Sequence, residues 1–379
     1  MCPYDTATLS SRIREEALRL GFFNTGIAPA GNLPYEAHFK TWLNEGFHGE
    51  MRYLERQAAK RRNPGLVLAN VRSIIAVALN YFTNCLLSTE PLKGRISRYA
   101  LGDDYHEPVS IRLERLLDFI KKLQPSVNGR CYVDTGPVME KVWGAQSALG
   151  WIGKHTNLIS RHRGSFFFIG TILLDIELEY DLEQKDFCGT CSRCIQACPT
   201  GAIVAPYILD ARLCVSYLTI EFRGAIPYSL RPSIGNRVFG CDDCQDVCPW
   251  NRFAAETSEK EFYPRTGIVM PDLVPLARIT PGEFEARFKG CSIRRATRDG
   301  FVRNVVVALG NSGRIEAVPP LSEALRDSSP LVRSHAAWAL GRIGSPRANR
   351  ILESARVLET DESVLQEIAA ALDSLENQP

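Results

Sequence analysis

The sequence has no long hydrophobic run and no large excess of charge of one sign. Its longest apolar stretches, such as 66–80 and 166–174, are interrupted or too short to cross a bilayer, so we expect no transmembrane span. Residues 1–16 contain no apolar signal-peptide core, so we expect a cytoplasmic chain whose thiols stay reduced. The formal net charge of +2 by itself favours neither a nucleic-acid binder nor an enzyme for acidic substrates.

The sequence is rich in cysteine, and eight of its 12 cysteines lie between positions 188 and 248. The first run has the spacing C-x2-C-x2-C-x3-C-P and ends at Pro199. After a lone cysteine, a second run repeats the ending C-x2-C-x3-C-P and closes at Pro249. This is the pattern of two-cluster ferredoxins, and eight thiolates are enough for two [4Fe–4S] clusters.

In such a run the fourth cysteine ligates the other cluster, and this rule predicts both ligand sets. One set is Cys188, Cys191, Cys194 and Cys248, and the other is Cys198, Cys214, Cys241 and Cys244. Paired C-x2-C units also build structural zinc sites, but zinc explains neither the third cysteine of the run nor the proline. Disulfides are disfavoured by the reducing compartment that we expect.

The sequence as a whole predicts an α+β protein of several domains. We expect the domain boundaries 1–175, 176–285 and 286–379. In the first segment, helices are expected near 9–20, 37–46, 110–123 and 141–149, and strands near 73–80, 131–133 and 165–174. Helices interleaved with separated strands indicate a layered domain rather than a bundle or a sandwich. In the last segment, Phe301–Gly310 is repeated by Leu331–Gly341 and, more weakly, by 364–372, which predicts short HEAT-like helix pairs.

Positive charge is concentrated between Lys289 and Arg350, where eleven basic side chains stand against four acidic ones. Such a segment is typical of a surface that binds a phosphate backbone, but also of a solvated helix face. The sequence alone leaves both alternatives open. A shorter basic cluster, Lys60-Arg61-Arg62, is interpreted as a solvated helix end and kept outside the site.

Several short motifs occur in a specific order around the cysteines. They are Arg98-Tyr99 through Asp104-Tyr105-His106, Asp134-Thr135-Gly136-Pro137, Gly150-Trp151-Ile152-Gly153-Lys154, Tyr217-Leu218-Thr219-Ile220-Glu221 and Ile234-Gly235-Asn236-Arg237. With the cysteines, they resemble the epoxyqueuosine reductases, cobalamin-dependent iron–sulfur enzymes of tRNA queuosine synthesis, over nearly the whole chain. The resemblance implies a nitroreductase-like cobalamin-binding domain, a bacterial ferredoxin-like two-cluster domain and C-terminal HEAT-like helical repeats.

The resemblance also implies a bound cobalamin in the cob(II)/cob(I) states. The motif Asp-x-His-x-x-Gly, which offers an axial histidine elsewhere, is missing, because Val109 stands where the glycine should be. This agrees with a base-off cofactor without a protein ligand. The candidates for cobalamin contacts are Arg98, Tyr105, His106, Lys154 and Asn157, although a loop anchor or a solvated turn would explain these residue types as well. The role of His155 stays open.

Reduction of an epoxide to an alkene removes oxygen as water and needs two electrons, two protons and a positioned acid. The resemblance assigns the acid to Asp134, which follows strand-like 131–133 and opens a Gly-Pro turn. The alternative is a turn-forming or helix-capping aspartate. As an acid near neutral pH, Asp134 is expected to have a pKa that is raised by burial beside the corrin.

The resemblance implies a tRNA substrate with a GUN anticodon that carries epoxyqueuosine. Arg294, Arg295 and Arg298 are the candidate phosphate contacts. We further expect an external electron donor, a flavodoxin or a ferredoxin-type reductase, and a monomer without membrane contact. Two other functions stay open: a reductive dehalogenase-like enzyme for a small molecule, and an electron-transfer ferredoxin fused to a protein-binding HEAT surface.

Overall fold

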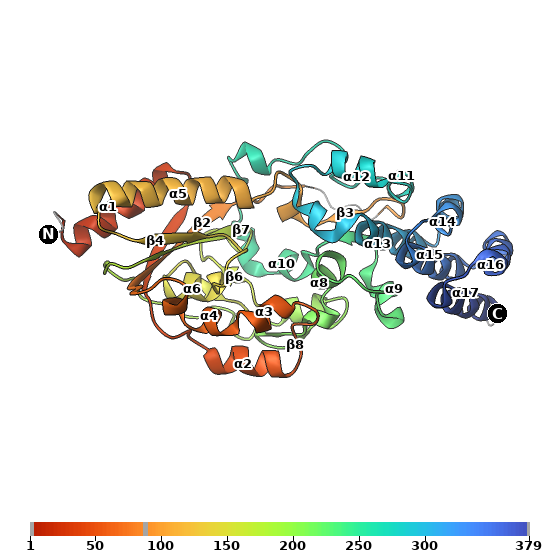
Figure 1. Ribbon diagram of the computed structural model, residues 1–379, viewed down its shortest axis with the longest axis horizontal. Coiled ribbons are helices and arrows are strands. Elements are labelled where there is room, and N and C mark those ends of the chain that lie inside the picture. Colours follow the sequence, from red (N-terminus) through yellow and green to blue (C-terminus); the bar gives the residue numbers. More distant parts are fainter. Residues whose placement is uncertain (1–3, 86–89, 377–379) are drawn as a thin grey trace. The chain divides into compact units, whose positions relative to one another are not determined.

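The computed structural model describes residues 4–85 and 90–376 and divides the chain into two compact units (Figure 1). Unit 1 comprises Met1–Asn84, Asp104–Ala211 and Asp243–Tyr263, and unit 2 comprises Cys85–Asp103, Arg212–Asp242 and Pro264–Pro379. Each unit is therefore assembled from three separate segments. The boundaries 1–175, 176–285 and 286–379 stay a prediction.

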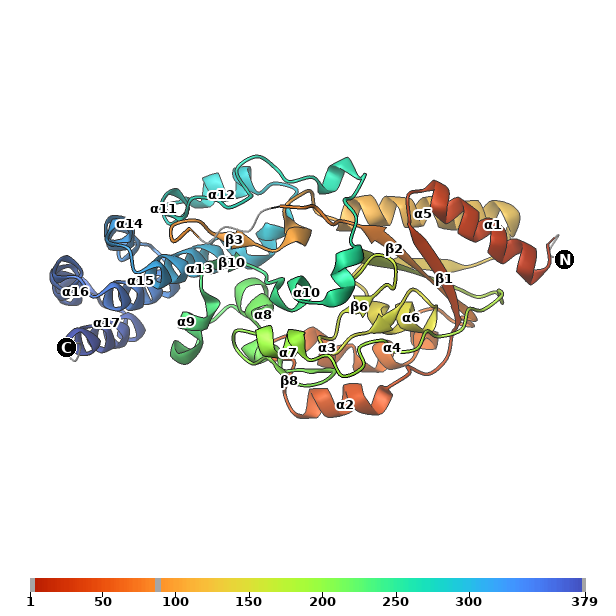
Figure 2. The same cartoon turned by 180° about the vertical axis from the view of Figure 1, so that it is seen from behind.

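Unit 1 is built on a four-stranded antiparallel sheet with the order β1-β2-β7-β4. Its strands are β1 (Asn24–Pro29), β2 (Ser73–Asn80), β4 (Gly129–Tyr132) and β7 (Phe167–Leu174). Helices α1 (Thr6–Arg19) and α5 (His106–Leu123) cover one face, and α6 (Glu140–Gln146) covers the other (Figures 1 and 2). Because both faces are covered, seven successive residues of β2 are buried, and the strand is continuously apolar rather than alternating.

The predicted layered α+β domain is confirmed, and strand 73–80 has the expected bounds. The other predicted helices and strands occur with ends displaced by a few residues, but β1 was not predicted. Its sequence Asn-Thr-Gly-Ile-Ala-Pro contains turn-forming residues. The glycine is required by close packing, because a Cβ atom at Gly26 would lie 1.6 Å from the carbonyl oxygen of Ser147.

Short elements complete unit 1. They are α2 (Glu36–Asn44), α3 (Arg52–Arg56), α4 (Ala58–Arg62), β5 (Trp151–Ile152), β6 (Leu158–Ile159), α7 (Arg193–Ala197), β8 (Ile203–Ala205), β9 (Ile208–Leu209) and α10 (Asp243–Asp246). β5 and β6 form one hairpin, and β8 and β9 form another. In the described ranges, we find no helix that is long and apolar enough to span a membrane.

Unit 2 is mostly helical, with one small parallel pair of strands, β3 (Arg95–Ile96) and β10 (Arg237–Phe239). Its shorter helices are α8 (Val215–Ile220), α9 (Arg231–Ile234), α11 (Leu273–Leu276) and α12 (Pro281–Arg287). The longer part consists of α13 (Thr297–Ser312), α14 (Val318–Ala324), α15 (Pro330–Ile343), α16 (Pro346–Leu358) and α17 (Glu362–Glu376).

The internal repeat sets the packing of α13, α15 and α17. A Cβ atom at Gly310 would lie 2.7 Å from Cβ of Ala339, and one at Gly341 would lie 2.7 Å from Cβ of Ala371. The glycine of each repeat thus lets the helix of the next repeat pack closely against it. The contact on that next helix is an alanine, Ala339 in one case and Ala371 in the other. The predicted HEAT-like repeat is confirmed, including its weak third copy.

We predict that Gly310→Ala lowers the free energy of unfolding by about 1–3 kcal/mol, because an added methyl group overpacks the α13–α15 contact. Urea denaturation measures the change. Gly282→Ala on α12 is the matched control, because nothing lies within 4 Å of the position of its added Cβ. Equal stability of the two variants would contradict this account of the repeat.

Candidate active site

Asp134 lies in the turn between β4 and α6, and its backbone is in a conformation that favours glycine. Its φ is 57°, and the N–H of Thr135 donates to the carbonyl of Val133 at 2.5 Å. A non-glycine residue at positive φ is uncommon and costs conformational energy, and such residues cluster at functional sites. The strained turn holds the Asp134 side chain with 70% of its surface exposed.

Two predicted site residues contact this carboxylate. The hydroxyl of Tyr105 donates to Oδ2 of Asp134 at 2.7 Å, and Nε2 of His106 lies 3.8 Å from the same oxygen. The other ring nitrogen of His106, Nδ1, lies 2.6 Å from Oδ1 of Asp104. The Tyr105 ring stacks on Phe168 of β7 with the centroids 4.2 Å apart and the planes inclined by 7°. The sheet therefore orients the groups that hold Asp134.

The contacts within this group set the charges of His106 and Asp134. Although burial opposes the change, the hydrogen bond to Asp104 and the nearby carboxylate of Asp134 raise the pKa of His106 to about 9. The contact with His106 has the largest effect and lowers the pKa of Asp134; burial opposes this change, and the hydrogen bond from Tyr105 lowers the pKa further. The pKa of Asp134 is therefore lowered in the protein without its cofactor, because donors surround a largely exposed carboxylate, and the raised pKa expected beside the corrin stays a prediction.

A buried arginine and a half-buried glutamate flank the Asp134 turn. Arg61 of α4 is only 6% exposed, and its Nη1 donates to the carbonyl of Val138 at 3.1 Å. The interpretation of this basic cluster as a solvated helix end is wrong for Arg61, because its side chain packs under the turn. Glu140 is the first residue of α6, and burial together with the charge of Asp134 raises its pKa to about 7.

His155 lies in the hairpin between β5 and β6 and is 3% exposed. Its Nδ1 accepts the backbone N–H of Asn157 at 3.2 Å, so the neutral ring carries its hydrogen on Nε2. Burial and the nearby charge of Lys141 lower the pKa of His155 to about 4. Nζ of Lys141 donates to Oδ1 of Asn157 at 2.8 Å, so the predicted site residue Asn157 orients this lysine.

Three polar atoms of this region are buried without a hydrogen-bond partner among the described residues: Nε of Arg61, Oε1 of Glu140 and Nε2 of His155. Buried polar atoms are almost always paired in folded proteins, so each is a position at which a ligand would complete the bonding. The three atoms comprise two donors and one carboxyl oxygen. They fit a ligand that carries many amide groups, as the side chains of cobalamin do.

The first predicted cluster set lies entirely in unit 1. Burial raises the pKa of the Cys248 thiol, and the charges of Cys188, Cys194 and Cys191 raise it further. The pKa of Cys194 is raised by burial and then by Cys188 and Cys191. The rule that the fourth cysteine of a run ligates the other cluster thus selects four thiols that interact electrostatically. This donor set fits one [4Fe–4S] cluster.

The second predicted set is divided between the units and stays a prediction. Cys198 and Cys244 belong to unit 1, whereas Cys214 and Cys241 belong to unit 2. The backbone N–H of Ala202 donates to Sγ of Cys198 at 3.2 Å. No group of three or more histidine, cysteine, aspartate or glutamate side chains in the described ranges is placed to hold a single metal ion.

Two other predicted cofactor contacts lie beside cysteine segments. Nζ of Lys154 donates to the carbonyls of Gly189 at 2.6 Å and Cys191 at 3.0 Å, so it fastens the loop of the first run. In unit 2, the backbone N–H of Arg98 donates to Oδ2 of Asp242 at 2.8 Å, next to Cys241 in the chain. A contact of either side chain with cobalamin stays a prediction.

The three arginines predicted to contact tRNA form ion pairs within unit 2. Arg294 pairs with Glu285 at 2.5 Å, Arg295 with Glu221 at 2.9 Å and Arg298 with Asp327 at 2.5 Å. A fourth arginine of the basic segment, Arg303, is fully buried and donates to the carbonyls of Leu218, Phe222 and Gly224. Arg303 therefore holds the segment that follows Cys214 in place and does not bind a ligand.

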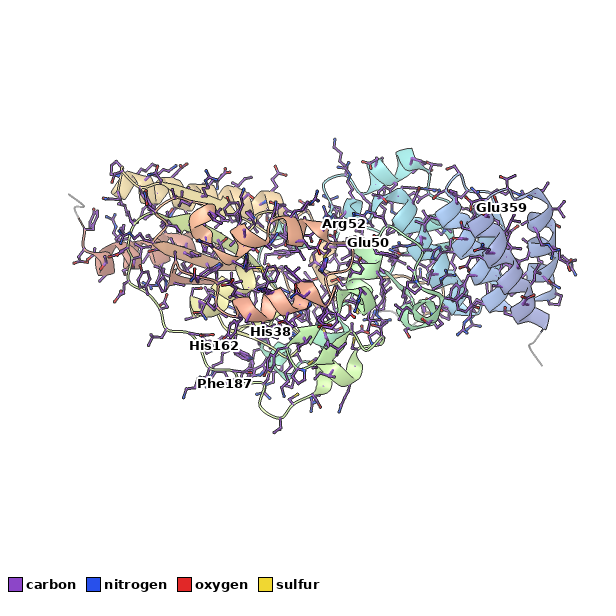
Figure 3. All side chains as sticks on the ribbon, turned by 60° about the horizontal axis from the view of Figure 1, so that its bottom comes forward. His38, Glu50, Arg52, His162, Phe187 and Glu359 are labelled. Carbon is purple, nitrogen blue, oxygen red and sulfur yellow. The ribbon has the colours of Figure 1, made fainter. Side chains whose placement is uncertain are left out.

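Other arginines of the basic segment are exposed along a groove of about 670 Å³ formed by α14 to α17. They are Arg326, Arg347 and Arg350, and among the residues that the structure describes we find no salt bridge to them. Arg333 lies in the same groove but binds Glu359, which is labelled in Figure 3, and this contact lowers the pKa of Glu359 to about 2. Charge counting alone could not separate the exposed arginines from the paired ones.

Three family models match separate stretches of the chain. The model described as a 4Fe-4S double cluster binding domain matches residues 187–251, and that of HEAT repeats matches 294–373. Fold and site together define an iron–sulfur oxidoreductase with two [4Fe–4S] clusters and a helical-repeat end. Residues 61–135 match the model described as epoxyqueuosine reductase QueG.

Whole-chain comparisons identify the family. The chain is 42% identical to the epoxyqueuosine reductase of Pseudomonas aeruginosa over 353 residues, 91% of this chain and 97% of the relative. It is 40% identical to that of Escherichia coli K12 over 344 residues, 90% and 91% of the two chains. A crystal structure of epoxyqueuosine reductase with an epoxyqueuosine-modified tRNA-Tyr stem loop matches with a TM-score of 0.92 and 31% identity, covering 97% of this chain and 99% of the other. The chain belongs to the epoxyqueuosine reductase family.

We predict that Cys198→Ala and Cys248→Ala each damage both clusters, because each cysteine would join one run to the cluster of the other. Iron and sulfide content and the electron paramagnetic resonance of the reduced protein measure the loss. Cys131→Ala is the control, since Cys131 lies on β4 outside both cysteine runs. Full iron content in either variant would contradict the predicted ligand sets.

Proposed function

We propose that this protein reduces epoxyqueuosine in tRNA to queuosine, with a bound cobalamin that receives electrons through the two clusters. The observation that carries the proposal is the strained Asp134 turn, in which Tyr105 and His106 contact one carboxylate that stays exposed. Membership of the family favours this function over a dehalogenase or a ferredoxin with a binding surface. Cobalamin in its reduced state would supply the two electrons of the reaction.

Asp134 is the acid that we propose for the epoxide oxygen. A positioned acid contributes about 10²–10⁴-fold to such a step, because the oxygen leaves far more easily once it is protonated. In the free protein the Asp134 carboxylate is ionised, but its side chain is also more exposed than that of His106. A corrin and a modified base that cover Asp134 would remove its water and raise its pKa, so the acid would form only in the loaded site.

The other residues of the site have supporting roles in this proposal. Tyr105 and His106 orient Asp134, while Arg61, Glu140 and His155 offer their unpaired polar atoms to the amide groups of the cofactor. Lys154 holds the loop of the first cysteine run through two carbonyls. We propose a flavodoxin or a ferredoxin-type reductase as the electron donor, and a cytoplasmic monomer as the working form.

The proposed substrate is a tRNA with a GUN anticodon that carries epoxyqueuosine, in line with the stem loop bound by the solved relative. The base must be turned into the site while its flanking phosphates are held. Arg326, Arg347 and Arg350 offer uncommitted charge along one groove. Arg294, Arg295 and Arg298 would first have to exchange their carboxylate partners for phosphates.

We predict that Asp134→Asn abolishes conversion of epoxyqueuosine in tRNA, with a loss of at least about 100-fold, while cobalamin loading is unchanged. The amide keeps the shape of the side chain but cannot donate the proton. Nucleoside mass spectrometry follows the product, and the visible absorbance of the bound corrin follows loading. Asp118→Asn on an exposed position of α5 is the control. Full turnover by Asp134→Asn would contradict the assignment of Asp134 as the acid.

We predict that reversing Arg326, Arg347 and Arg350 to Glu weakens tRNA binding and lowers the slope of log affinity against log salt by about one per lost phosphate contact. Filter binding at several salt concentrations measures both quantities. Arg115→Glu, an exposed position on α5, controls for net charge. Affinity and salt slope that match the control would exclude this groove from the tRNA interface.

A further inference from the structure

Glu140 lies at the opposite end of the turn that Asp134 opens, and apart from the unpaired oxygen that it offers to the cofactor it has no role in the proton transfer described so far. Its Oε1 is buried and has no hydrogen-bond partner among the described residues. The charged groups that act on this carboxyl are Asp134 in the turn and Arg61 on α4, which also holds the turn through the carbonyl of Val138. Asp134 in turn faces His106 of α5 and Lys141 of α6.

The stoichiometry of the proposed reaction leaves a proton without a source. Both carbon–oxygen bonds of the epoxide break, a carbon–carbon double bond forms, and the oxygen leaves as water with two protons. The two electrons come from the reductant of the reaction. One carboxyl carries one proton at a time, so Asp134 must be protonated again before the second bond breaks.

We propose that Glu140 is the proton store of the Asp134 turn: Asp134 takes up its first proton from solvent as the site is covered, and Glu140 holds a second proton that it passes to Asp134 after the first transfer. Glu140 would be a positioning residue that acts through Asp134 and does not touch the epoxide. The inference rests on the proposed function and extends it by naming the source of the second proton.

The unlike environments of the two carboxyls support this division of roles. Burial and the charge of Asp134 raise the pKa of Glu140 to about 7, whereas the contact with His106 lowers the pKa of Asp134. Carboxyls whose environments push their pKa values apart are a common basis for acid and base roles in one site. When the pair carries one proton, that proton is therefore on Glu140 rather than on Asp134.

His106 is the competing store, because its ring also faces Asp134. Although burial opposes the change, the hydrogen bond to Asp104 and the nearby carboxylate of Asp134 raise the pKa of His106 to about 9, so it is the weaker acid at neutral pH. A proton donor works best when its pKa is near the working pH, which favours Glu140. His106 instead keeps Asp134 ionised until the site is covered.

The first test detects the stored proton without any turnover. In infrared spectra of the free protein, the carbonyl band of a protonated carboxylic acid should decrease as the pH rises through about 7, and Glu140→Gln should remove it. Glu177→Gln is the matched control, because this glutamate is exposed and pairs with Arg72 at the surface. A band that persists in Glu140→Gln, or is absent from the wild type at pH 6, overturns the proposal.

The second test follows one turnover of the reduced, cofactor-loaded enzyme on epoxyqueuosine-containing tRNA between pH 6 and 8. We expect Glu140→Gln to be about 10–100-fold slower at pH 7 and to lose the fall in rate that the wild type shows as the pH rises, while Glu140→Asp keeps that fall. A wild-type pH profile in Glu140→Gln, or equal damage in both variants, overturns the proposal. A wild type that does not convert the substrate is a failure of the proposed function, and the infrared band is independent of it.

Discussion

The pairing of β7 with β2 is the constraint on which the active site depends. The two strands pair antiparallel from Ser73 with Leu174 to Asn80 with Phe167, and β4 joins the other edge of β7. This arrangement places the turn that follows β4 beside the aromatic surface of β7, where Phe168 supports Tyr105. Helix α6 packs on β7 as well, so both ends of the Asp134 turn are fixed by one buried strand.

The same arrangement explains why the site combines strain with unpaired polar atoms. A positive φ at Asp134 persists only because the surrounding structure determines it. Buried polar atoms on Arg61, Glu140 and His155 lower stability unless a ligand completes their hydrogen bonds. Both features are costs in the free protein that binding of a large polar cofactor would offset. The site is therefore arranged for a ligand rather than for stability alone.

Local patterns in the sequence were enough to predict much of this structure. Cysteine spacing, continuous apolar runs and the repeat of small residues depend on neighbours in the chain, so the cluster segment, β2 and the helical repeats could be predicted. The strand β1 was missed because Gly26 serves a distant contact with Ser147. The burial of Arg61 and the ion pairs of Arg294, Arg295 and Arg298 also depend on distant partners. The lowered pKa of Asp134 required knowing where His106 lies.

The central claim is that this chain removes the epoxide oxygen of a tRNA base. The most direct measurement is nucleoside mass spectrometry of epoxyqueuosine-containing tRNA, incubated without oxygen with reduced protein that carries cobalamin and both clusters. The account predicts that epoxyqueuosine is replaced by a nucleoside lacking one oxygen atom, and that omission of cobalamin prevents the change. Unchanged epoxyqueuosine with fully loaded, reduced protein would contradict it.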